Sequence, residues 1–446
     1  MKNLDLQKIN NVHFVGIGGI GISAIARMMK AMGKNVTGQD MQDGEIVEDL
    51  KKLGIDIVIG QSYENIPNNC DLIVYTIAIE YYDPELFKKL KEQEIQIFSY
   101  PEMLGLVSRD KYTIAISGTH GKTTTTGMIA KILKDTGNDP TVVIGSLIKD
   151  FDNPNSQGTN FMAGESKYFV MEACEYRRSF LNINPNILVI TNIDEDHLDY
   201  YKDIEDIKSA FHQLVMKVPS DGFIIYDPKD KNIQDVIKDV KAKVVDFQEF
   251  FNSELKLKIP GIHNKKDAAA ATAAAACLGI PKSNSEKSLE SFPGTWRRFE
   301  YKGKVFKGTL LYDDYGHHPT EIMATLQGFR ELYPKNEGWK ITVVFQPHLF
   351  SRTKLLLDDF AQSFKDADQV MLLPIYYARE VDDGSISSEK LAFEINKYTD
   401  NTEAFPDFKK LEKNLIVRLL KMRDKDIIIT MGAGEAFKIG DFLLKL

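Results

Sequence analysis

The pattern that most constrains this chain is an alternation of short apolar runs with amphipathic stretches, which starts three times along the sequence. In the first hundred residues, VHFVGIG, KNVTGQD and DLIVYTIAI predict strands, and residues 20–33 predict a helix between the first two. Strands that alternate with helices favour βαβ units and a parallel sheet. The first part of the chain is therefore expected to be an α/β domain.

Two further sections repeat this pattern. A polar break at SRDK, residues 108–111, ends the first section, and the third section begins after SFPGTWRRF. The predicted helices of the later sections span residues 122–136, 203–217, 319–332, 353–365 and 387–397. A length of 446 residues also suggests about three domains. We expect three tandem α/β domains: a Rossmann-like domain at 1–109, a central P-loop domain at 110–295 and a second Rossmann-like domain at 296–446.

Composition excludes several classes of protein. The formal net charge of -8 argues against a general nucleic-acid binder, which usually carries a basic face. The start of the chain, MKNLDLQKIN, lacks the apolar core of a signal peptide. The alanine-rich run at 268–277 is about half as long as a membrane span, and it predicts a closely packed helix. We expect no membrane insertion and no nucleic-acid partner.

The number and spacing of the cysteines indicate the redox environment of the protein. Their number is odd and their spacing is wide, so they offer neither a disulfide framework nor a metal-knuckle pattern: Cys70, Cys174 and Cys277. A reducing, cytoplasmic location is therefore expected.

A glycine-rich turn lies between the first predicted strand and its helix. It places Gly16, Gly18 and Gly21 in a G-x-G-x-x-G pattern, and Asp40 follows at the end of the next strand. Such glycines let the backbone approach a pyrophosphate, the helix N-terminus faces its charge, and an acidic residue can bind ribose hydroxyls. The turn indicates a nucleotide diphosphate without identifying it. An NAD-dependent dehydrogenase is one alternative, and a tight turn without a ligand is another.

A second glycine turn, within ISGTHGKTTTTGMIA at 116–130, differs from the usual phosphate-binding loop. The pattern G-x-x-x-x-G-K-[ST] requires glycine at 116, where this chain has Ile116, and the first glycine is Gly118. The turn still follows a strand and opens a helix. Lys122 is therefore expected to reach the terminal phosphates, and the Thr123 hydroxyl to bind magnesium. A turn that merely tolerates glycine does not explain a lysine followed by four threonines.

Two other predicted strands end in polar residues. YFVMEAC ends near Glu172, and ILVITNIDEDHLDYY delivers Thr191, Asn192 and His197. Ligands of open α/β sheets collect at the carboxyl ends of strands, so these side chains are expected near the phosphates. Glu172 is then a candidate magnesium ligand, and His197 a ligand for a metal or a substrate carboxylate. Residues 194–196 predict a solvated turn.

Seven motifs together resemble a known family. They occur in the order SGTHGKTTTT, EACEYRRSFL, TNIDEDHLDYY, HNKKDAAAA, WRRF, DDYGHHPTEI and FQPHLFSRTK. In this order they resemble the Mur ligases, and the resemblance covers essentially the whole chain, GIGGIGISAIA included. In that family the phosphate-binding loop has the short G-x-x-G-K-T form, and the first glycine loop belongs to a UDP-sugar site.

The resemblance implies a reaction. It is ATP-dependent ligation of L-alanine to the carboxylate of UDP-N-acetylmuramate through an acyl phosphate, in peptidoglycan precursor synthesis, with ATP and Mg²⁺ as cofactors. A monomer or a homodimer is expected. Within the family the alternative is a recycling ligase that adds a preformed peptide to the same UDP-sugar. The dehydrogenase alternative leaves Lys122, Glu172 and the third domain unexplained, and a regulatory homologue without catalysis leaves the combination of Lys122, Thr123, Glu172 and His197 unexplained.

The resemblance also implies site residues. It places the UDP-sugar at Gly16, Gly18, Gly19, Ile20, Gly21, Ser23, Asp40, Thr76 and Asn192. It places ATP at Gly118, Thr119, His120, Gly121, Lys122, Thr123, Thr124, His263, Asn264, Arg298 and Asp314. The metal ligands are Thr123, Glu172 and His197, and the catalytic residues are Lys122, His197 and Arg298. The amino-acid site is formed by Tyr315, His317, His348 and Arg352.

Two positions depart from the family pattern, and two assignments have simpler alternatives. Asp267 replaces an asparagine on the adenine side, and Leu349 stands where many relatives have a second arginine. Arg352 is then the main cation for the amino-acid carboxylate, through bidentate pairing. The pair His317–His318 is equally typical of turn capping and core packing, and Arg298 of an ordinary surface charge.

Overall fold

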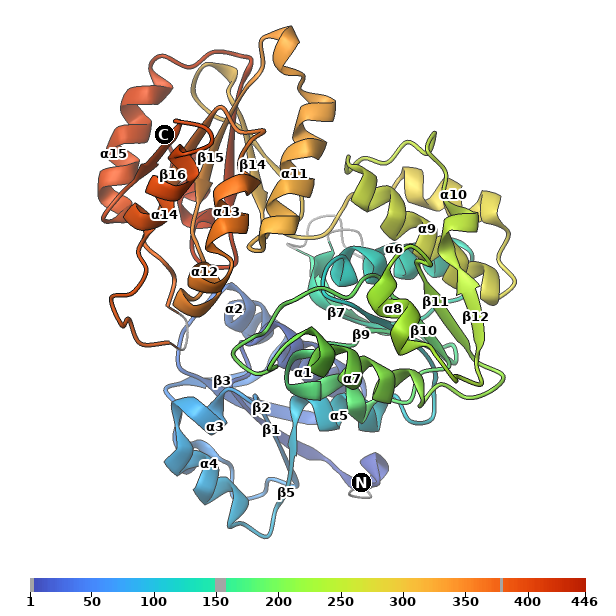
Figure 1. Ribbon diagram of the computed structural model, residues 1–446. Helices are drawn as coiled ribbons and strands as arrows, with labels where there is room; N and C mark the ends of the chain where they lie inside the picture. Colours follow the sequence, from blue (N-terminus) through green and yellow to red (C-terminus); the bar gives the residue numbers. More distant parts are fainter. Residues whose placement is uncertain (1–3, 149–157, 378–379) are drawn as a thin grey trace. The chain divides into compact units, whose positions relative to one another are not determined.

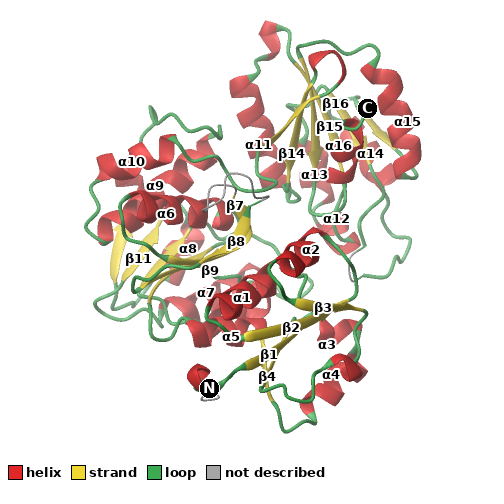
Figure 2. Ribbon diagram, turned by 180° about the vertical axis from the view of Figure 1, so that it is seen from behind, coloured by secondary structure: helices red, strands yellow, loops and turns green. Residues whose placement is uncertain are grey.

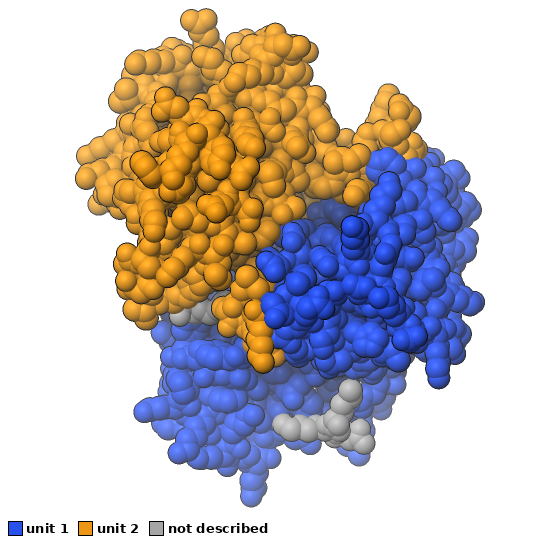
Figure 3. All heavy atoms as spheres, viewed as in Figure 1, with its two compact units in different colours: residues 1–195, 203–251, 267–289 blue, residues 196–202, 252–266, 290–446 orange. Residues whose placement is uncertain are grey.

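The described part of the chain contains three separate sheets, of five, seven and six strands, which Figure 1 shows. The computed structural model describes residues 4–148, 158–377 and 380–446. Contacts divide the chain into two compact units, shown in blue and orange in Figure 3. Unit 1 contains 1–195, 203–251 and 267–289, and unit 2 contains 196–202, 252–266 and 290–446. The expected α/β class with three domains is confirmed, while the predicted domain boundaries stay predictions.

The first sheet has the order β3-β2-β1-β4-β5, and every neighbouring pair is parallel. Its strands are β1 (Asn11–Val15), β2 (Asn35–Asp40), β3 (Asp56–Ile59), β4 (Leu72–Tyr75) and β5 (Gln96–Ser99). Its helices are α1 (Ile20–Ala31), α2 (Glu45–Lys52), α3 (Ile79–Tyr82), α4 (Pro84–Lys91) and α5 (Tyr100–Val107). The strand order reverses beside β1, which is where such sheets bind ligands.

The second sheet has the order β12-β11-β10-β6-β9-β7-β8, with β6 near its centre and β8 antiparallel to β7. Its strands are β6 (Tyr112–Ser117), β7 (Thr141–Ile148), β8 (Thr159–Met162), β9 (Tyr168–Glu172), β10 (Ile187–Ile190), β11 (Phe223–Tyr226) and β12 (Lys243–Asp246). The helices of this part are α6 (Lys122–Asp135), α7 (Ile204–Val215), α8 (Lys231–Val236), α9 (Ile262–Cys277) and α10 (Lys282–Glu290). The alanine-rich run lies in α9 and its alanines at 268–271 and 273–275 are buried, as expected.

The third sheet has the order β13-β14-β18-β15-β16-β17, in which only β13 is antiparallel to its neighbour. Its strands are β13 (Glu300–Lys304), β14 (Leu310–Asp314), β15 (Lys340–Phe345), β16 (Gln369–Leu372), β17 (Thr402–Ala404) and β18 (Asp426–Met431). Its helices are α11 (Pro319–Leu332), α12 (Phe350–Leu355), α13 (Leu357–Ser363), α14 (Ser388–Asn396), α15 (Phe408–Leu419) and α16 (Phe437–Leu443).

Helices enclose the strands of the sheets, red around yellow in Figure 2. The central strands are therefore apolar on both faces, as β10 illustrates with four consecutive buried residues. One predicted helix is wrong: in place of a single helix at 353–365 there are two, α12 and α13, which are separated by Leu356. Leu356 has φ -104° and ψ 26°, outside the α-helical region. The apolar run LLL crosses this break, so composition gives no sign of it.

The first two sheets belong to the same compact unit because α1 packs on the edge of the second sheet. Asn160 of β8 is buried, and its amide donates to the Ile20 carbonyl and to Ser23 Oγ. These bonds hold the first turn of α1 against β8. The helix that follows the first glycine turn is therefore fixed to the domain that carries the second one.

A buried polar network lies beneath the first glycine turn. His13 on β1 is 1% exposed, with Nδ1 2.8 Å from Thr37 Oγ1 and Nε2 3.1 Å from Gln39 Nε2. The Gln39 side-chain oxygen accepts from Ser62 N, so the amide nitrogen must donate to His13. His13 is therefore neutral, with its proton on Nδ1. Burial lowers the pKa of His13 from 6.5 to about 4.

We expect His13 to make folding sensitive to acid. Its folded pKa lies below the unfolded value, so its contribution is complete above about pH 6.5 and is lost as the pH falls toward 4. At pH 5.5 the loss is about 1 kcal/mol. Thermal unfolding at pH 7.5 and 5.5 should show a larger fall in Tm for the wild type than for His13→Gln. Equal falls would contradict the neutral assignment.

Candidate active site

The connection from β6 to α6 has the backbone of a phosphate-binding turn. We call residues 118–121 the phosphate loop. Gly118 has φ 131° and Gly121 has φ 81°, which side chains rarely tolerate. A Cβ on Gly118 would also overlap with Thr191 Oγ1. The shortened loop therefore requires glycine at both positions, and α6 begins directly at Lys122, with Gly121 as its N-cap.

The end of β10 holds the phosphate loop from the side. Strands β6 and β10 are parallel, with Ser117 opposite Ile190. Asn192 then accepts a bond from His120 N at 2.9 Å and donates to the His120 carbonyl at 3.0 Å. Its backbone oxygen accepts from Thr119 N at 3.1 Å. Both polar atoms of the Asn192 amide thus bond to the phosphate loop. Its assignment to the UDP-sugar stays a prediction.

Lys122 is folded back onto the phosphate loop. Its ammonium donates to the carbonyls of Gly118 and Thr119 and, at 3.0 Å, to Oε1 of Glu175. Burial alone would lower the pKa of Lys122, but the charge and hydrogen bond of Glu175, together with Cys174 and Glu172, hold it above its ordinary value. The Glu175 side chain is 4% exposed. Sequence reasoning missed Glu175, although it lies in the EACEYRRSFL motif.

The strand on the other side of β6 delivers Glu172. It ends β9, opposite Ile116 in the parallel register, and its Oε1 accepts from Gly145 N at 2.9 Å. Thr123 lies in the first turn of α6 and is buried. A carboxylate and a hydroxyl are hard oxygen ligands of the kind that magnesium prefers. These two residues therefore fit the metal assignment chemically, whereas the third assigned ligand, His197, belongs to unit 2.

The first glycine turn is fixed by β2. The Gln39 carbonyl accepts from Gly16 N at 2.8 Å and Ile17 N at 3.1 Å, and Asp40 Oδ2 accepts from Gly18 N at 2.8 Å. Asp40 therefore fixes the backbone of the turn. The missing side chain at Gly21 leaves room for the Tyr100 ring, which a Cβ would approach to 2.7 Å.

Three other residues assigned to the sugar also have structural contacts. Thr76 packs against Gly16, where its methyl group leaves no space for a Cβ. Ser23 is buried and donates to the Ile20 carbonyl at 3.0 Å while it accepts from Asn160. Gly19 is the N-cap of α1. Their roles in UDP-sugar binding stay predictions.

The four residues assigned to the amino acid lie together in unit 2. Tyr315 and His317 follow β14, while His348 and Arg352 follow β15, so all four come from carboxyl ends of strands. The His317 ring lies 5.5 Å from the Tyr315 ring and 6.0 Å from the His348 ring, between centroids. Arg352 Nη1 lies 3.2 Å from His348 Nδ1. We call Tyr315, His317, His348 and Arg352 the amino-acid cluster.

The two consecutive histidines differ in role. His318 is buried and caps α11: its ring accepts from Thr320 N, and Glu321 completes the capping box. His317 instead joins the amino-acid cluster, with Nδ1 3.1 Å from the Tyr315 carbonyl. Burial lowers the pKa of His317 to about 4, so it is neutral near pH 7. The capping alternative therefore describes His318.

The expected solvated turn at 194–196 is wrong for Asp196. Its side chain is only 10% exposed, and its Oδ1 lies 2.8 Å from Arg352 Nη2 and 3.2 Å from Nε. Although burial alone would raise the pKa of Asp196, the neighbouring His197 imidazole and the Arg352 guanidinium hold it far below its ordinary value. A run of three acidic residues is usually solvated, and nothing in the run marks its last member as buried.

The WRRF segment contains one structural and one accessible arginine. Arg297 is buried and pairs with Asp313 at 2.6 Å. Arg298 is partly exposed, lies 3.6 Å from Glu321, and stacks over the Tyr315 ring at 5.3 Å. Arg298 thus lies beside the amino-acid cluster.

Of the residues assigned to ATP, Asn264 and Asp314 are buried, whereas His263 is partly exposed. Asp314 accepts from Phe299 N and Gly316 N, each at 2.8 Å, so it fixes the turns that carry Arg298 and Tyr315. Burial raises its pKa to about 6. His263 has a pKa lowered to about 4, first by burial and then by the charge of Arg298. Asn264 donates to the Pro260 carbonyl. These contacts leave the ATP assignments as predictions.

Asp267 lies against the start of α6. A Cβ on Gly121 would approach Asp267 Oδ1 to 2.5 Å. A carboxylate therefore borders the phosphate loop at the position where the family pattern has asparagine.

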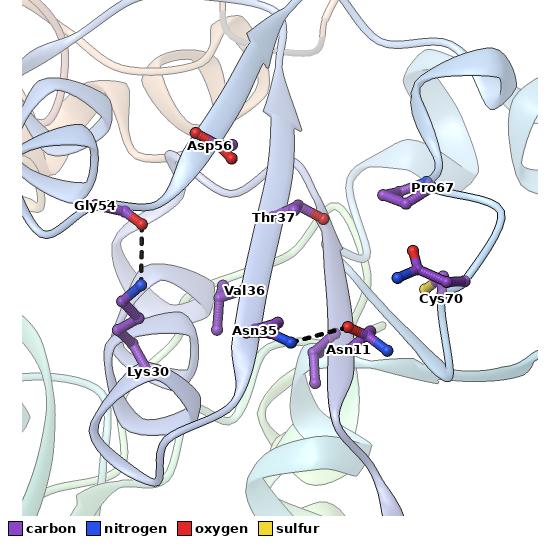
Figure 4. A pocket seen from close by; sticks show the side chains of 11 residues that line it. Asn11, Lys30, Asn35, Val36, Thr37, Gly54, Asp56, Pro67 and Cys70 are labelled. Atoms are coloured by element: carbon purple, nitrogen blue, oxygen red, sulfur yellow. Dashed lines mark hydrogen bonds between the residues drawn. The ribbon is translucent and has the colours of Figure 1, made fainter.

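A cavity of about 320 Å³ in the first domain lies away from the glycine turn (Figure 4). It is lined by residues near the amino ends of the strands, among them Asn11, Asn35 and Asp56. Asn35 donates to Asn11 at 3.1 Å, and Lys30 donates to the Gly54 carbonyl at 2.9 Å. Nucleotides bind at the carboxyl ends of such strands, so this cavity is not assigned to the substrate.

Comparison with known proteins places the chain in a family. Residues 11–112 match the catalytic domain of the Mur ligase family, residues 116–250 the Mur ligase middle domain, and residues 297–434 the glutamate ligase domain of Mur ligases. The chain therefore belongs to the Mur ligase family. The family resemblance inferred from the motifs is confirmed.

Individual relatives match over nearly the whole chain. It is 40% identical to the UDP-N-acetylmuramate–L-alanine ligase of Acetivibrio thermocellus, over 99% of this chain and 97% of that protein. The ligase of the same name from Clostridium acetobutylicum is 42% identical, over 100% and 99%. The solved UDP-N-acetylmuramate–alanine ligase of Thermotoga maritima is 27% identical, over 98% of each chain, with a TM-score of 0.79.

A murein peptide ligase from Psychrobacter arcticus shares the fold, with a TM-score of 0.72 at 24% identity over 98% of each chain. These matches favour a ligase over the dehydrogenase alternative. Among the described residues, no helix is long and apolar enough to cross a membrane.

The phosphate loop should be intolerant of a side chain at Gly118. We expect Gly118→Ala to abolish binding of a fluorescent ATP analogue, because the new Cβ overlaps with Thr191 and the positive φ is strained. Gly137→Ala is a matched control: Gly137 has φ 75°, and a Cβ there meets nothing within 4 Å. Equal nucleotide binding by both variants would show that the turn is not the ATP site.

Proposed function

We propose that this chain catalyses the ATP-dependent ligation of L-alanine to the carboxylate of UDP-N-acetylmuramate, a step of peptidoglycan precursor synthesis. The observation that supports it most is the shortened phosphate loop, with Lys122 at its end and Glu172 on the adjacent strand. Relatives that carry this activity in their names match the chain over nearly its full length. A cytoplasmic location and a monomeric or homodimeric state stay predictions.

The chemistry explains why such an enzyme needs ATP. A carboxylate is a poor acyl donor because its oxygen is a poor leaving group. Transfer of the γ-phosphoryl group of ATP to the carboxylate releases ADP and forms an acyl phosphate. The amine of L-alanine then attacks the acyl carbon, the C–O bond to phosphate breaks, and inorganic phosphate leaves as the amide forms. The amine loses its proton before the product is complete.

Lys122 acts on the phosphoryl group. Two anions, ATP and the carboxylate, must approach each other, so a cation at the phosphate oxygens stabilises the transfer. The Lys122 ammonium donates to two loop carbonyls and to Glu175. A phosphate oxygen must therefore replace at least one of these acceptors when ATP binds. Backbone N–H groups of the phosphate loop and of the first turn of α6 bind the other oxygens.

Thr123 and Glu172 would hold a magnesium ion in this proposal. Their oxygen ligands and their positions beside the phosphate loop suit that ion. A bound magnesium ion supplies positive charge that neutralises the phosphate oxygens. His197 is proposed as a further ligand and as a contact of the substrate carboxylate.

The sugar and the amino acid occupy the other predicted sites. The first glycine turn faces the UDP diphosphate in this proposal, and its backbone N–H groups lie at the N-terminus of α1. Arg352 binds the carboxylate of L-alanine, while Tyr315, His317 and His348 surround the amino acid. Arg298 and His263 belong to the ATP side.

Phosphate release from ATP tests this function. We expect release to require both UDP-N-acetylmuramate and L-alanine, with other amino acids less effective. Lys122→Ala should abolish release but leave UDP-N-acetylmuramate binding nearly unchanged, because Lys122 acts only on the phosphates. Lys131→Ala, on the same helix and paired with Asp135, is the matched control and should remain active. Release that requires a preformed peptide instead of L-alanine would identify the recycling ligase.

Arg352 should govern use of the free amino acid. Loss of a charge-assisted hydrogen bond in a closed site costs about 1.5–3 kcal/mol, or roughly ten- to a hundredfold. Arg352→Ala should raise the KM for L-alanine by this factor with little change in the KM for ATP. Hydroxylamine should still trap the acyl phosphate, because the lesion lies after activation. An unchanged KM for L-alanine would remove Arg352 from the site.

A further inference from the structure

The Arg352 guanidinium, which we assign to the carboxylate of the amino-acid substrate, is already paired with a carboxylate of the protein, that of Asp196. Asp196 Oδ1 accepts from Arg352 Nη2 at 2.8 Å and from Nε at 3.2 Å. Both side chains are buried, at 10% and 7% exposure, in a single compact unit. This is a desolvated ion pair, which is much harder to separate than a surface pair unless another charge takes its place.

The third guanidinium nitrogen, Nη1, also has a partner within the protein. Arg352 Nη1 lies 3.2 Å from the His348 ring nitrogen and 3.4 Å from the His348 carbonyl. Every nitrogen of the guanidinium therefore makes a bond within the protein. A carboxylate that binds arginine with two parallel bonds needs one full edge of the guanidinium, either Nε with Nη2 or Nη1 with Nη2. A substrate carboxylate can obtain the first edge only where Asp196 now lies.

We propose that Asp196 competes with the carboxylate of the incoming amino acid for Arg352, and so sets the affinity and selectivity of this site. The proposal rests on the assignment of Arg352 to the amino acid under the proposed function. Exchange of one carboxylate for another keeps the buried guanidinium neutralised throughout. An amine without a carboxylate cannot make this exchange and is rejected.

The KM for L-alanine in the Asp196→Asn variant shows whether Asp196 competes with the substrate carboxylate or helps Arg352 to bind it. Asp196→Asn keeps the shape but removes the charge, so L-alanine no longer has to displace a carboxylate. The KM for L-alanine should fall by roughly tenfold, and the KM for ATP should stay the same. Glu195→Gln removes the adjacent, exposed carboxylate and should leave the KM for L-alanine unchanged. A rise or no change in Asp196→Asn would overturn the proposal.

The double variant tests whether Asp196 acts through Arg352. In the Arg352→Ala background, Asp196→Asn should have no effect on the KM for L-alanine, and any remaining fall would contradict competition for Arg352. If Arg352→Ala alone leaves that KM unchanged, the assignment of Arg352 fails and the proposal fails with it. If Arg352→Ala raises the KM but Asp196→Asn does not lower it, only the competition fails.

A measurement on the wild-type protein covers the case in which Asp196→Asn does not fold. The Nε–H NMR resonance of Arg352, assigned with Arg352→Lys, reports which carboxylate it meets. L-alanine, added with UDP-N-acetylmuramate and a non-hydrolysable ATP analogue, should shift this resonance, whereas L-alaninamide should not. No shift with L-alanine, or the same shift with both compounds, would contradict the exchange.

Discussion

The ammonium of Lys122 holds the phosphate loop in its conformation through hydrogen bonds to the loop backbone. A buried cation is costly unless it is paired and hydrogen-bonded. Here two carbonyls of the loop and the Glu175 carboxylate supply those bonds. Because the carbonyls belong to Gly118 and Thr119, the ammonium also fixes the backbone of the loop to which we assign the phosphate oxygens. The glycine conformations, the Asn192 bonds and the start of α6 all contribute to this arrangement.

The same arrangement recurs in unit 2, where Asp196 neutralises Arg352. In both places a cation assigned to an anionic substrate is held by an acidic side chain of the protein. Each pair neutralises a buried cation within the protein. Under the proposed function, each substrate binds by exchanging with this existing partner. The affinity for a substrate is then a difference between two charge-assisted interactions, and a single carboxylate of the protein can alter it.

Much of the fold could be predicted because it depends on local patterns. Alternating apolar runs and amphipathic stretches predicted three α/β domains, and the spacing of the glycines before Lys122 predicted a glycine turn that opens a helix. The amino-acid cluster also came together as the strand-end argument requires. Glu175 and Asp196 could not be found in this way. Each is an acidic residue beyond a strand end, and only tertiary packing makes it a buried partner instead of a solvated turn.

The break between α12 and α13 and the contacts of Asn192 were hidden for the same reason. The break lies inside a continuous run of leucines, and Asn192 bonds to a loop distant from it in sequence. Such features depend on which segments pack together in the fold. A single sequence shows only which secondary structure each segment favours. The motifs therefore predicted which segments form the candidate site, but not the internal contacts that Lys122 and Arg352 make there.

The central claim is that ATP activates the carboxylate of UDP-N-acetylmuramate before L-alanine attacks it. Substrate labelled with oxygen-18 in that carboxylate tests it most directly. An acyl phosphate retains one carboxylate oxygen on phosphorus, so the account predicts that one labelled oxygen appears in the released inorganic phosphate. Formation of the amide without any labelled oxygen in the released phosphate would contradict it.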